Sequence, residues 1–248
     1  MPRHHCPGPH GPVTDRLRPG SALGLLLTVQ LSVLVMLALG FEAVLDDVTD
    51  DIRGDPAAEV GDGGELTSLD APVSSAVIAA RRPWLSEFFE VVTWAGSAAV
   101  LLPLVALAGL HLHRRTGSWR PLIFLGTGLC GAMMVSTLIK LAVARPRPPV
   151  VMALVDTVGY AFPSGHATAA AAGWLALAAA LAARTSRSTP KLLLVSAAVL
   201  ITGLVGLSRV YLGVHEPTDV LGGWALGALW VLAVAVVLRL LDSRHPPP

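Results

Sequence analysis

Six long apolar runs constrain the fold of this chain more than any other feature of its sequence. They extend over residues 22–41, 88–110, 121–143, 166–183, 192–207 and 220–241. A helix needs about 20 apolar residues to cross a hydrocarbon layer, and only helices and closed barrels satisfy their backbone groups there. The runs therefore predict an all-α integral membrane protein with six transmembrane helices in a bundle.

The composition favours the same class of protein. Of the 248 residues, 53% are hydrophobic and only 14% are charged, whereas about a quarter of the residues in a soluble domain are charged. The 18 Lys and Arg residues nearly balance the 17 Asp and Glu residues, which gives no reason to expect a nucleic acid partner. Cys6 lies in a polar segment and Cys130 inside an apolar run, so we expect no disulfide and no cysteine metal site.

Basic residues are unevenly distributed along the chain. Eleven of the 18 fall before the first run, after the second run, after the fourth run and at the C-terminus. Cytoplasmic loops accumulate Lys and Arg near helix ends. We therefore predict a multi-pass protein of the cell membrane with both termini in the cytoplasm. Residues 1–20 are interpreted as a disordered cytoplasmic tail, residues 21–41 as the first transmembrane helix and residues 242–248 as a second cytoplasmic tail.

Residues 42–87 are predicted to form a long acidic loop on the extracytoplasmic side. Twelve of the 17 acidic residues lie between Glu42 and Glu90, and the first half of this stretch has the glycine and aspartate content of an exposed loop. From Asp70 to Arg81, apolar residues recur at roughly helical spacing. This interval fits an amphipathic helix on the membrane surface, and it fits an irregular loop equally well.

Four basic residues on the predicted outer side are not explained by an excess of basic residues in a loop. These are Lys140, Arg145, Arg147 and Arg209. A cation near the end of an apolar helix is costly unless it has a function or its long side chain reaches the interface. Two prolines follow the helix that carries Lys140, so Arg147 lies on a stiff loop that can fold back over the lysine.

Two further polar groups come directly before apolar runs. Ser164 and Gly165 precede the fourth run, where free backbone N–H groups and the helix dipole form an anion site; a plain N-cap would explain Ser164 but not His166. His215 and Asp219 are four residues apart. In a helical turn the carboxylate would accept the Nδ1–H and leave Nε2 with a nucleophilic lone pair. The alternative is an ordinary surface His–Asp pair.

These residues form a coherent chemical set. It comprises two histidines, one carboxylate, several cations and a helix start, with no group of Asp, Glu and His spaced for a divalent ion. Such a set suits metal-free phosphoryl transfer through a phosphohistidine, which needs a nucleophile, a proton donor and charge stabilisation.

Three ordered blocks of sequence resemble the signature motifs of the type 2 phosphatidic acid phosphatase (PAP2) superfamily. The blocks are Lys140-x6-Arg147-Pro148, Pro163-Ser164-Gly165-His166 and Ser208-Arg209-x5-His215-x3-Asp219. Eleven specified residues in order make a strong signal, unlike a lone short motif. The resemblance implies a six-helix fold with residues 88–241 as the catalytic core, a lipid phosphate substrate, and neither a metal nor another cofactor.

The resemblance also implies a role for each motif residue. His215 attacks phosphorus, Asp219 orients His215, and His166 protonates the leaving oxygen. The phosphoryl oxygens are held by the other motif residues, which are Lys140, Arg147, Ser164, Gly165 and Arg209. Arg145 lies outside the pattern and is predicted to be a contact at the rim of the site.

The three motifs fall at the predicted outer ends of the last four spans, where a lipid headgroup of the outer leaflet can reach them. We therefore predict a lipid phosphatase that hydrolyses a phosphate monoester or pyrophosphate on the extracytoplasmic face. Candidate substrates are undecaprenyl pyrophosphate, phosphatidylglycerol phosphate and phosphatidic acid. Two alternatives remain open, namely phosphotransfer to an acceptor alcohol and transport of anionic lipids.

Overall fold

The computed structural model describes residues 19–53 and 66–244. Most of the predicted N-terminal tail, with Cys6, and the last four residues of the predicted C-terminal tail lie outside the described residues. The interval 54–65 of the predicted acidic loop lies outside them as well.

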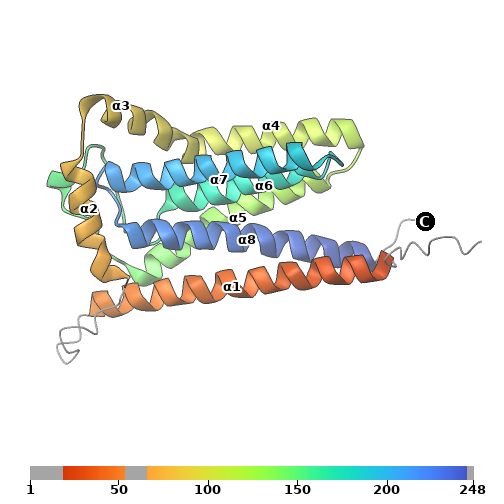
Figure 1. Ribbon diagram of the computed structural model, residues 1–248, viewed down its shortest axis with the longest axis horizontal. Helices are drawn as coiled ribbons and strands as arrows, with labels where there is room; N and C mark the ends of the chain where they lie inside the picture. Colours follow the sequence, from red (N-terminus) through yellow and green to blue (C-terminus); the bar gives the residue numbers. More distant parts are fainter. Residues whose placement is uncertain (1–18, 54–65, 245–248) are drawn as a thin grey trace, which may run out of the picture.

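The regular elements of the described residues are all helical (Figure 1). The α-helices are α1 (Pro19–Arg53), α2 (Asp70–Ala79), α3 (Pro83–Val92), α4 (Ala98–Thr116), α5 (Arg120–Val143), α6 (Gly165–Ala182), α7 (Ser188–Tyr211) and α8 (Pro217–Arg244). Short 3-10 turns cover Thr67–Leu69, Thr93–Gly96 and Val150–Met152. Within this part of the chain, five helices are long and apolar enough to span a membrane, and α3 with α4 can make a sixth span with a bend of 46°. The predicted all-α membrane bundle is confirmed.

Two predicted boundaries are wrong. The first helix continues to Arg53 instead of ending near residue 41, because Val44 and Val48 lie four residues apart and bury against Phe162 while the other face of the helix is acidic. The predicted span 88–110 is broken at Ser97. This residue has an extended backbone, and its side chain caps α4 by accepting a hydrogen bond from the backbone N–H three residues later.

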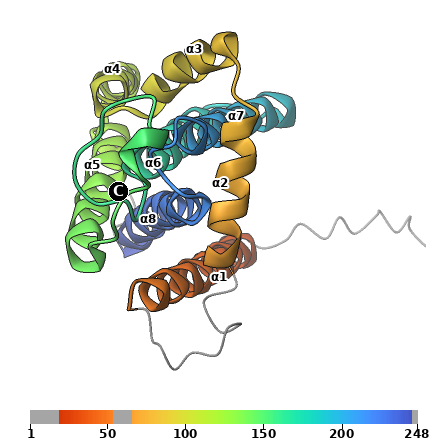
Figure 2. The same cartoon turned by 90° about the vertical axis from the view of Figure 1, so that its left-hand side faces the viewer.

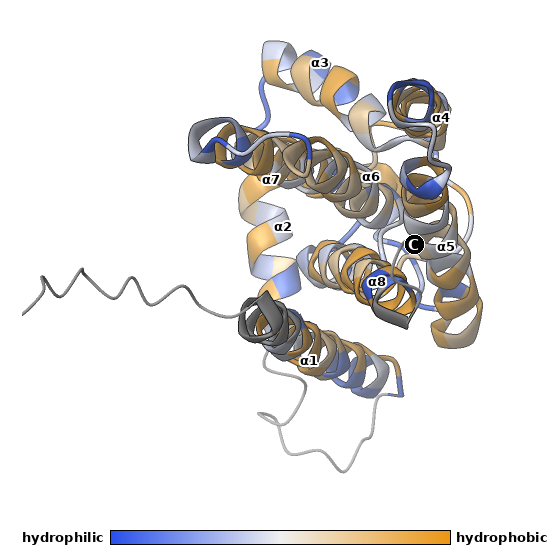
Figure 3. Ribbon diagram, turned by 90° about the vertical axis from the view of Figure 1, so that its right-hand side faces the viewer, coloured by the Kyte–Doolittle hydropathy of each residue, from blue (hydrophilic) through white to orange (hydrophobic). Residues whose placement is uncertain are grey.

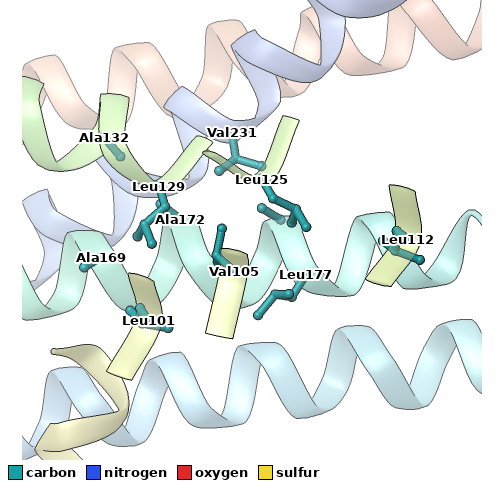
Figure 4. Packing of buried hydrophobic residues seen from close by; sticks show 11 residues of the cluster. Leu101, Val105, Leu112, Leu125, Leu129, Ala132, Ala169, Ala172, Leu177 and Val231 are labelled. Carbon is teal, nitrogen blue, oxygen red and sulfur yellow. The ribbon is translucent and has the colours of Figure 1, made fainter. Parts of the chain in front are cut away.

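Helix α6 is the centre of the bundle and contacts α4, α5, α7 and α8. Its sequence is mostly alanine, and such small side chains let the neighbouring helices approach closely. Figure 4 shows leucines of α4 and α5, with Val231 of α8, packed on the alanines of α6. The alanine-rich run is thus suited to a central helix surrounded by larger apolar residues.

The outward faces of the helices are apolar, and polar residues gather at their ends. Exposed large side chains include Met36, Leu107, Leu138 and Leu192. Figure 3 shows this separation, with hydrophilic residues at the helix ends and hydrophobic residues along the helices. This is the distribution expected of helices in contact with lipid.

Helix α2 crosses one end of the bundle, and we call this the α2 end (Figure 2). It contacts α7 and α8. The segment after it is fixed to the end of α7, because Arg81 donates from Nε to the carbonyl oxygen of Tyr211 at 2.9 Å. The backbone N–H of Arg82 donates to the Tyr211 hydroxyl at 3.0 Å. The interval from Asp70 is therefore helical and docked on the bundle; its position at a membrane surface stays a prediction.

Candidate active site

Four helix ends meet at the α2 end and carry the predicted site residues. Helices α5 and α7 end there, and α6 and α8 begin there. The turn between α7 and α8 depends on Gly213, which has φ of 72° and lies so close to the Met152 carbonyl oxygen that a Cβ atom would collide with it. This tight turn brings His215 back beside the first turn of α8.

His215 is buried between a carboxylate and a guanidinium. Its Nδ1 is 3.1 Å from Asp219 Oδ2, and its Nε2 is 3.3 Å from Arg147 Nη1. A guanidinium has only donors, so Nε2 acts as the acceptor and Nδ1 carries the proton. The backbone N–H of Glu216 also donates to Asp219 Oδ2, at 3.0 Å. The lone pair of the imidazole therefore faces away from the carboxylate.

The environment of His215 keeps its imidazole neutral. Burial lowers the pKa of His215 to about 4, and the hydrogen bond and negative charge of Asp219 offset only part of this effect. The cations of Arg209 and Lys140 lower the same pKa further. Near neutral pH the side chain is in the form that a nucleophile requires.

Lys140 and Arg147 hold one loop segment between them. Lys140 Nζ donates to the carbonyl oxygens of Tyr160 and Ala161 at 2.9 and 3.1 Å. Arg147 Nε donates to the carbonyl oxygen of Gly159 at 2.9 Å. The sequence predicted that the loop with Arg147 can fold back over Lys140, and in the structure both side chains bind carbonyl oxygens of the same segment, residues 159–161.

Arg209 is 3% exposed and has a donor left over. Its Nη1 donates to the hydroxyl of Thr93 at 2.8 Å. Its buried Nε has no hydrogen-bond partner among the described residues. Buried donors are nearly always paired, so an unpaired one on a predicted phosphate-binding residue suggests a ligand. Thr93 was missed in the sequence because a threonine in an apolar stretch gives no signal of its own.

Ser164 precedes α6 as its N-cap, and its Oγ accepts from the backbone N–H of Ala167 at 3.5 Å. A cavity of about 230 Å³ lies beside this helix start. It is lined by Gly96, Ala98, Met133, Ser136, Thr137, Lys140, Gly165, His166 and Ala169. Thr137 is exposed on the side of α5, so the cavity reaches from His166 to the flank of the bundle between α4 and α5.

Arg145 is not at the rim, and that prediction is wrong. The side chain is buried behind His215, where Nη1 donates to Asp219 Oδ1 at 2.8 Å and Nη2 donates to Asp70 Oδ2 at 2.9 Å. The preceding Ala144 has a left-handed backbone with φ of 52°, which ends α5 and turns the chain inward. Burial alone lowers the pKa of the Arg145 guanidinium, but the carboxylates of Asp219 and Asp70 raise it above its ordinary value.

Asp70 was missed as a residue of this region. Its sequence signal, an acidic residue at the start of a helix, has an ordinary explanation as a helix cap. In the structure it is the first residue of α2, Leu69 holds the cap position, and the carboxylate points to Arg145.

The described residues contain no group of three His, Cys, Asp or Glu side chains that could hold a metal ion. Cys130 is a free and exposed thiol. The predicted site residues instead bring a neutral imidazole, a second histidine, three cations and a helix start to one end of the bundle, which is the set that phosphoryl transfer requires.

Comparison with known proteins places this chain in a family. The model of the PAP2 superfamily matches residues 121–241. Phosphatidylglycerophosphatase B of Bacillus subtilis (strain 168) is 38% identical over 170 residues, which are 66% of this chain and 80% of that protein. Decaprenylphosphoryl-5-phosphoribose phosphatase of Mycobacterium tuberculosis (strain ATCC 25618 / H37Rv) is 38% identical over 175 residues, which are 69% of this chain and 89% of that protein.

A solved structure agrees with the sequence comparison. The crystal structure of the first transmembrane PAP2 type phosphatidylglycerolphosphate phosphatase from Bacillus subtilis matches with a TM-score of 0.71 and 30% identity. The match covers 86% of this chain and 96% of the other. The chain therefore belongs to the PAP2 superfamily and is one of its metal-independent membrane lipid phosphatases.

Proposed function

We propose that this phosphatase removes the terminal phosphate of a membrane lipid through a phosphohistidine formed on His215. The geometry of that side chain carries the proposal. Its Nδ1 faces Asp219 at 3.1 Å and its Nε2 faces a guanidinium at 3.3 Å. A neutral imidazole with its lone pair directed at a cationic group can attack a phosphorus atom whose oxygens bind that group.

In the first half of the reaction, Nε2 of His215 forms a bond to phosphorus, and the bond from phosphorus to the leaving oxygen breaks. The leaving oxygen takes a proton from the imidazolium form of His166, which becomes neutral, so the lipid departs as an alcohol or as a lipid phosphate. Lys140, Arg147 and Arg209 stabilise the charge on the phosphoryl oxygens. The unpaired Nε of Arg209 supports this role, because it is a buried donor available to an anion.

In the second half, water attacks the phosphorus and gives a proton to His166. The N–P bond breaks and returns neutral His215 with inorganic phosphate. Each cycle thus consumes one water molecule and leaves both histidines as they began.

The cavity beside His166 supports a lipid substrate. It continues along Met133, Ser136 and Thr137 of α5 and reaches the flank of the bundle. A lipid can therefore place its phosphate beside Lys140 and His166 while its chain stays in the hydrocarbon layer. Both relatives are named for lipids whose headgroup carries a further phosphate. We propose the same class here, which includes phosphatidylglycerol phosphate and undecaprenyl pyrophosphate, with phosphatidic acid as the simpler alternative.

The test is phosphate release by the purified protein from these three lipids in EDTA, together with trapping of a labelled phosphohistidine. Replacement of His215 by Ala should lower phosphate release by about a thousandfold or more and remove the trapped label. Strong inhibition by EDTA, or unchanged release by the variant, would contradict the mechanism. A lipid transporter would keep its lipid flux without His215, and a phosphotransferase would form a new phospholipid when an acceptor alcohol is added.

We propose that the α2 end faces the extracytoplasmic side. The basic residues of the opposite end support this orientation, because Lys and Arg accumulate on the cytoplasmic side. In a background with both cysteines replaced by Ser, a thiol reagent that cannot cross membranes should label Val151→Cys in intact cells and should not label Ser186→Cys. The reverse pattern would invert the orientation.

A further inference from the structure

The carboxylate of Asp219 is held from two sides, and the second side leads to α2. Its Oδ2 faces His215, and its Oδ1 accepts a hydrogen bond from Arg145 Nη1 at 2.8 Å. The other terminal nitrogen of Arg145 donates to Asp70 Oδ2 at 2.9 Å. We propose that Asp70 and Arg145 are positioning residues, which hold the carboxylate that orients the nucleophilic histidine.

This chain of charges is almost closed to solvent. Asp70 is 5% exposed, Arg145 is 6% exposed and Asp219 is 0% exposed. Thr218 completes the closure, because its backbone N–H donates to Asp70 Oδ1 at 2.9 Å and its hydroxyl donates to Asp70 Oδ2 at 2.5 Å. Asp70 therefore accepts from three donors on two segments that are distant in sequence.

Stability is a poor explanation for such a network. Buried charges lose their hydration, and their mutual attraction often repays only part of that loss, so apolar residues of similar volume would commonly hold the helices together as well. A network that fixes the direction of one reactive side chain gains a function that apolar packing does not provide.

The charges also matter for the proposed reaction, on which this inference rests. When Nε2 of His215 bonds to phosphorus, its ring gains positive charge, which a nearby anion stabilises. Arg145 alone would neutralise Asp219. Because Asp70 is bound to the same guanidinium, the buried groups of the network, which are two carboxylates and one guanidinium, keep one net negative charge near the ring. Asp70 thus acts on the transition state and not on substrate binding.

Helix α2 supplies a matched control for this role. Ser74 lies one turn after Asp70 and donates its hydroxyl to Glu216 at 2.5 Å, so it also fixes α2 beside the start of α8. Among the described residues, it makes no side-chain hydrogen bond to Arg145. A second control is Asp51 at the end of α1, a half-exposed carboxylate 3.6 Å from the Arg145 guanidinium.

The experiment measures kcat and KM for Asp70→Asn, Ser74→Ala and Asp51→Asn in the purified full chain. We expect Asp70→Asn to lower kcat by about tenfold or more with KM changed by no more than about twofold, because an interaction made in the transition state is lost. The two control variants should keep kcat within about twofold. Melting temperatures in detergent report whether each variant is folded.

Several results would overturn the inference. Unchanged kcat in folded Asp70→Asn would do so. A fall in kcat of Ser74→Ala as large as that of Asp70→Asn would do so too, because it would trace the effect to the docking of α2. If Asp70→Asn does not fold, Arg145→Lys decides, because lysine keeps the charge but cannot bridge two carboxylates; its kcat must fall by a similar factor. His215→Ala separates the two proposals: if it retains activity the proposed function fails, whereas an inactive His215→Ala beside a fully active Asp70→Asn removes only this inference.

Discussion

The cations of the candidate site at the α2 end and the basic residues at the opposite end are of the same residue types in opposite settings. At the end away from α2 the described basic side chains are exposed, and these are Arg114, Arg115, Arg120, Arg184, Arg187, Lys191 and Arg239. At the α2 end, Arg145 and Arg209 are 6% and 3% exposed, and Lys140 and Arg147 are half-buried. Membrane topology alone accounts for the first group, whereas burial of a cation costs several kcal/mol unless acceptors surround it.

The difference lies in what each charge contacts. At the α2 end, carbonyl oxygens hold Lys140 and Arg147, carboxylates hold Arg145, and a hydroxyl holds one side of Arg209. These contacts fix direction as well as charge. At the other end, membrane topology depends only on the positive charge of the basic residues, so one exposed arginine can replace another.

The largest expected difference between the ends is in catalysis. Arg209→Ala should lower kcat by about a hundred- to a thousandfold, the loss typical when a preorganised donor to a developing charge is removed. Arg184→Ala, an exposed arginine at the other end, should leave kcat within about twofold. Steady-state phosphate release from the best of the three candidate lipids, assayed on folded protein, measures both.

A lysine at position 209 refines this comparison. Arg209→Lys keeps the charge but loses the fork that contacts Thr93 and leaves Nε for a ligand. Its kcat should fall between the values of the parent and Arg209→Ala. If Arg184→Ala lost as much activity as Arg209→Ala, burial would not be what separates the two ends.

The fold could be predicted from the sequence where one physical signal dominated. Apolar length identified the transmembrane helices because a membrane helix must be long and apolar. The same signal ended α1 too early, since residues 42–53 form a helix with one buried face and one acidic face, and average hydropathy does not detect that pattern. The bend before α4 was missed because a serine that caps a helix looks the same in sequence as one inside it.

The residues of the candidate site also divide into those that could be predicted from the sequence and those that could not. Residues in motifs could be found because their spacing repeats a family pattern. Asp70, Thr93 and Thr218 could not, because their importance comes from contacts with residues 75 to 148 positions away, as in the bond from Thr218 to Asp70. Arg145 was visible as an unexplained cation, but its burial depends on the loop after α5 folding inward.

An effect of intermediate size is expected for the pH dependence of stability, and it tests the burial of His215 at the α2 end. Burial lowers the pKa of His215 from an ordinary value of 6.5 to about 4. Between these values the unfolded chain binds a proton at this residue and the folded chain does not, so stability falls as the pH decreases from about 6.5 to about 4. Above pH 6.5 His215 is neutral in both the folded and the unfolded chain, so its protonation no longer lowers the stability. We expect an effect on the order of a few kcal/mol.

Melting temperatures of the parent and His215→Gln across this pH range isolate that contribution. The parent should lose more stability on acidification than the variant, because other groups titrate in both proteins. Equal pH dependence in the two would show that the imidazole is not protected from protonation, and the burial of the α2 end would then lack the electrostatic effect ascribed to it.

The smallest expected effect concerns an ion pair at the opposite end. Arg120 and Asp242 approach to 2.6 Å, closer than the 2.8 Å between Arg145 and Asp219. Their side chains are 65% and 45% exposed, however, against 8% and 0% for the buried pair. Exposed pairs contribute about 0 to 1 kcal/mol, whereas breaking a buried pair costs about 3–5 kcal/mol. Arg120→Ala should therefore shift the melting temperature in detergent only slightly and leave kcat unchanged. A loss above about 2 kcal/mol would mean that distance, and not burial, governs these pairs.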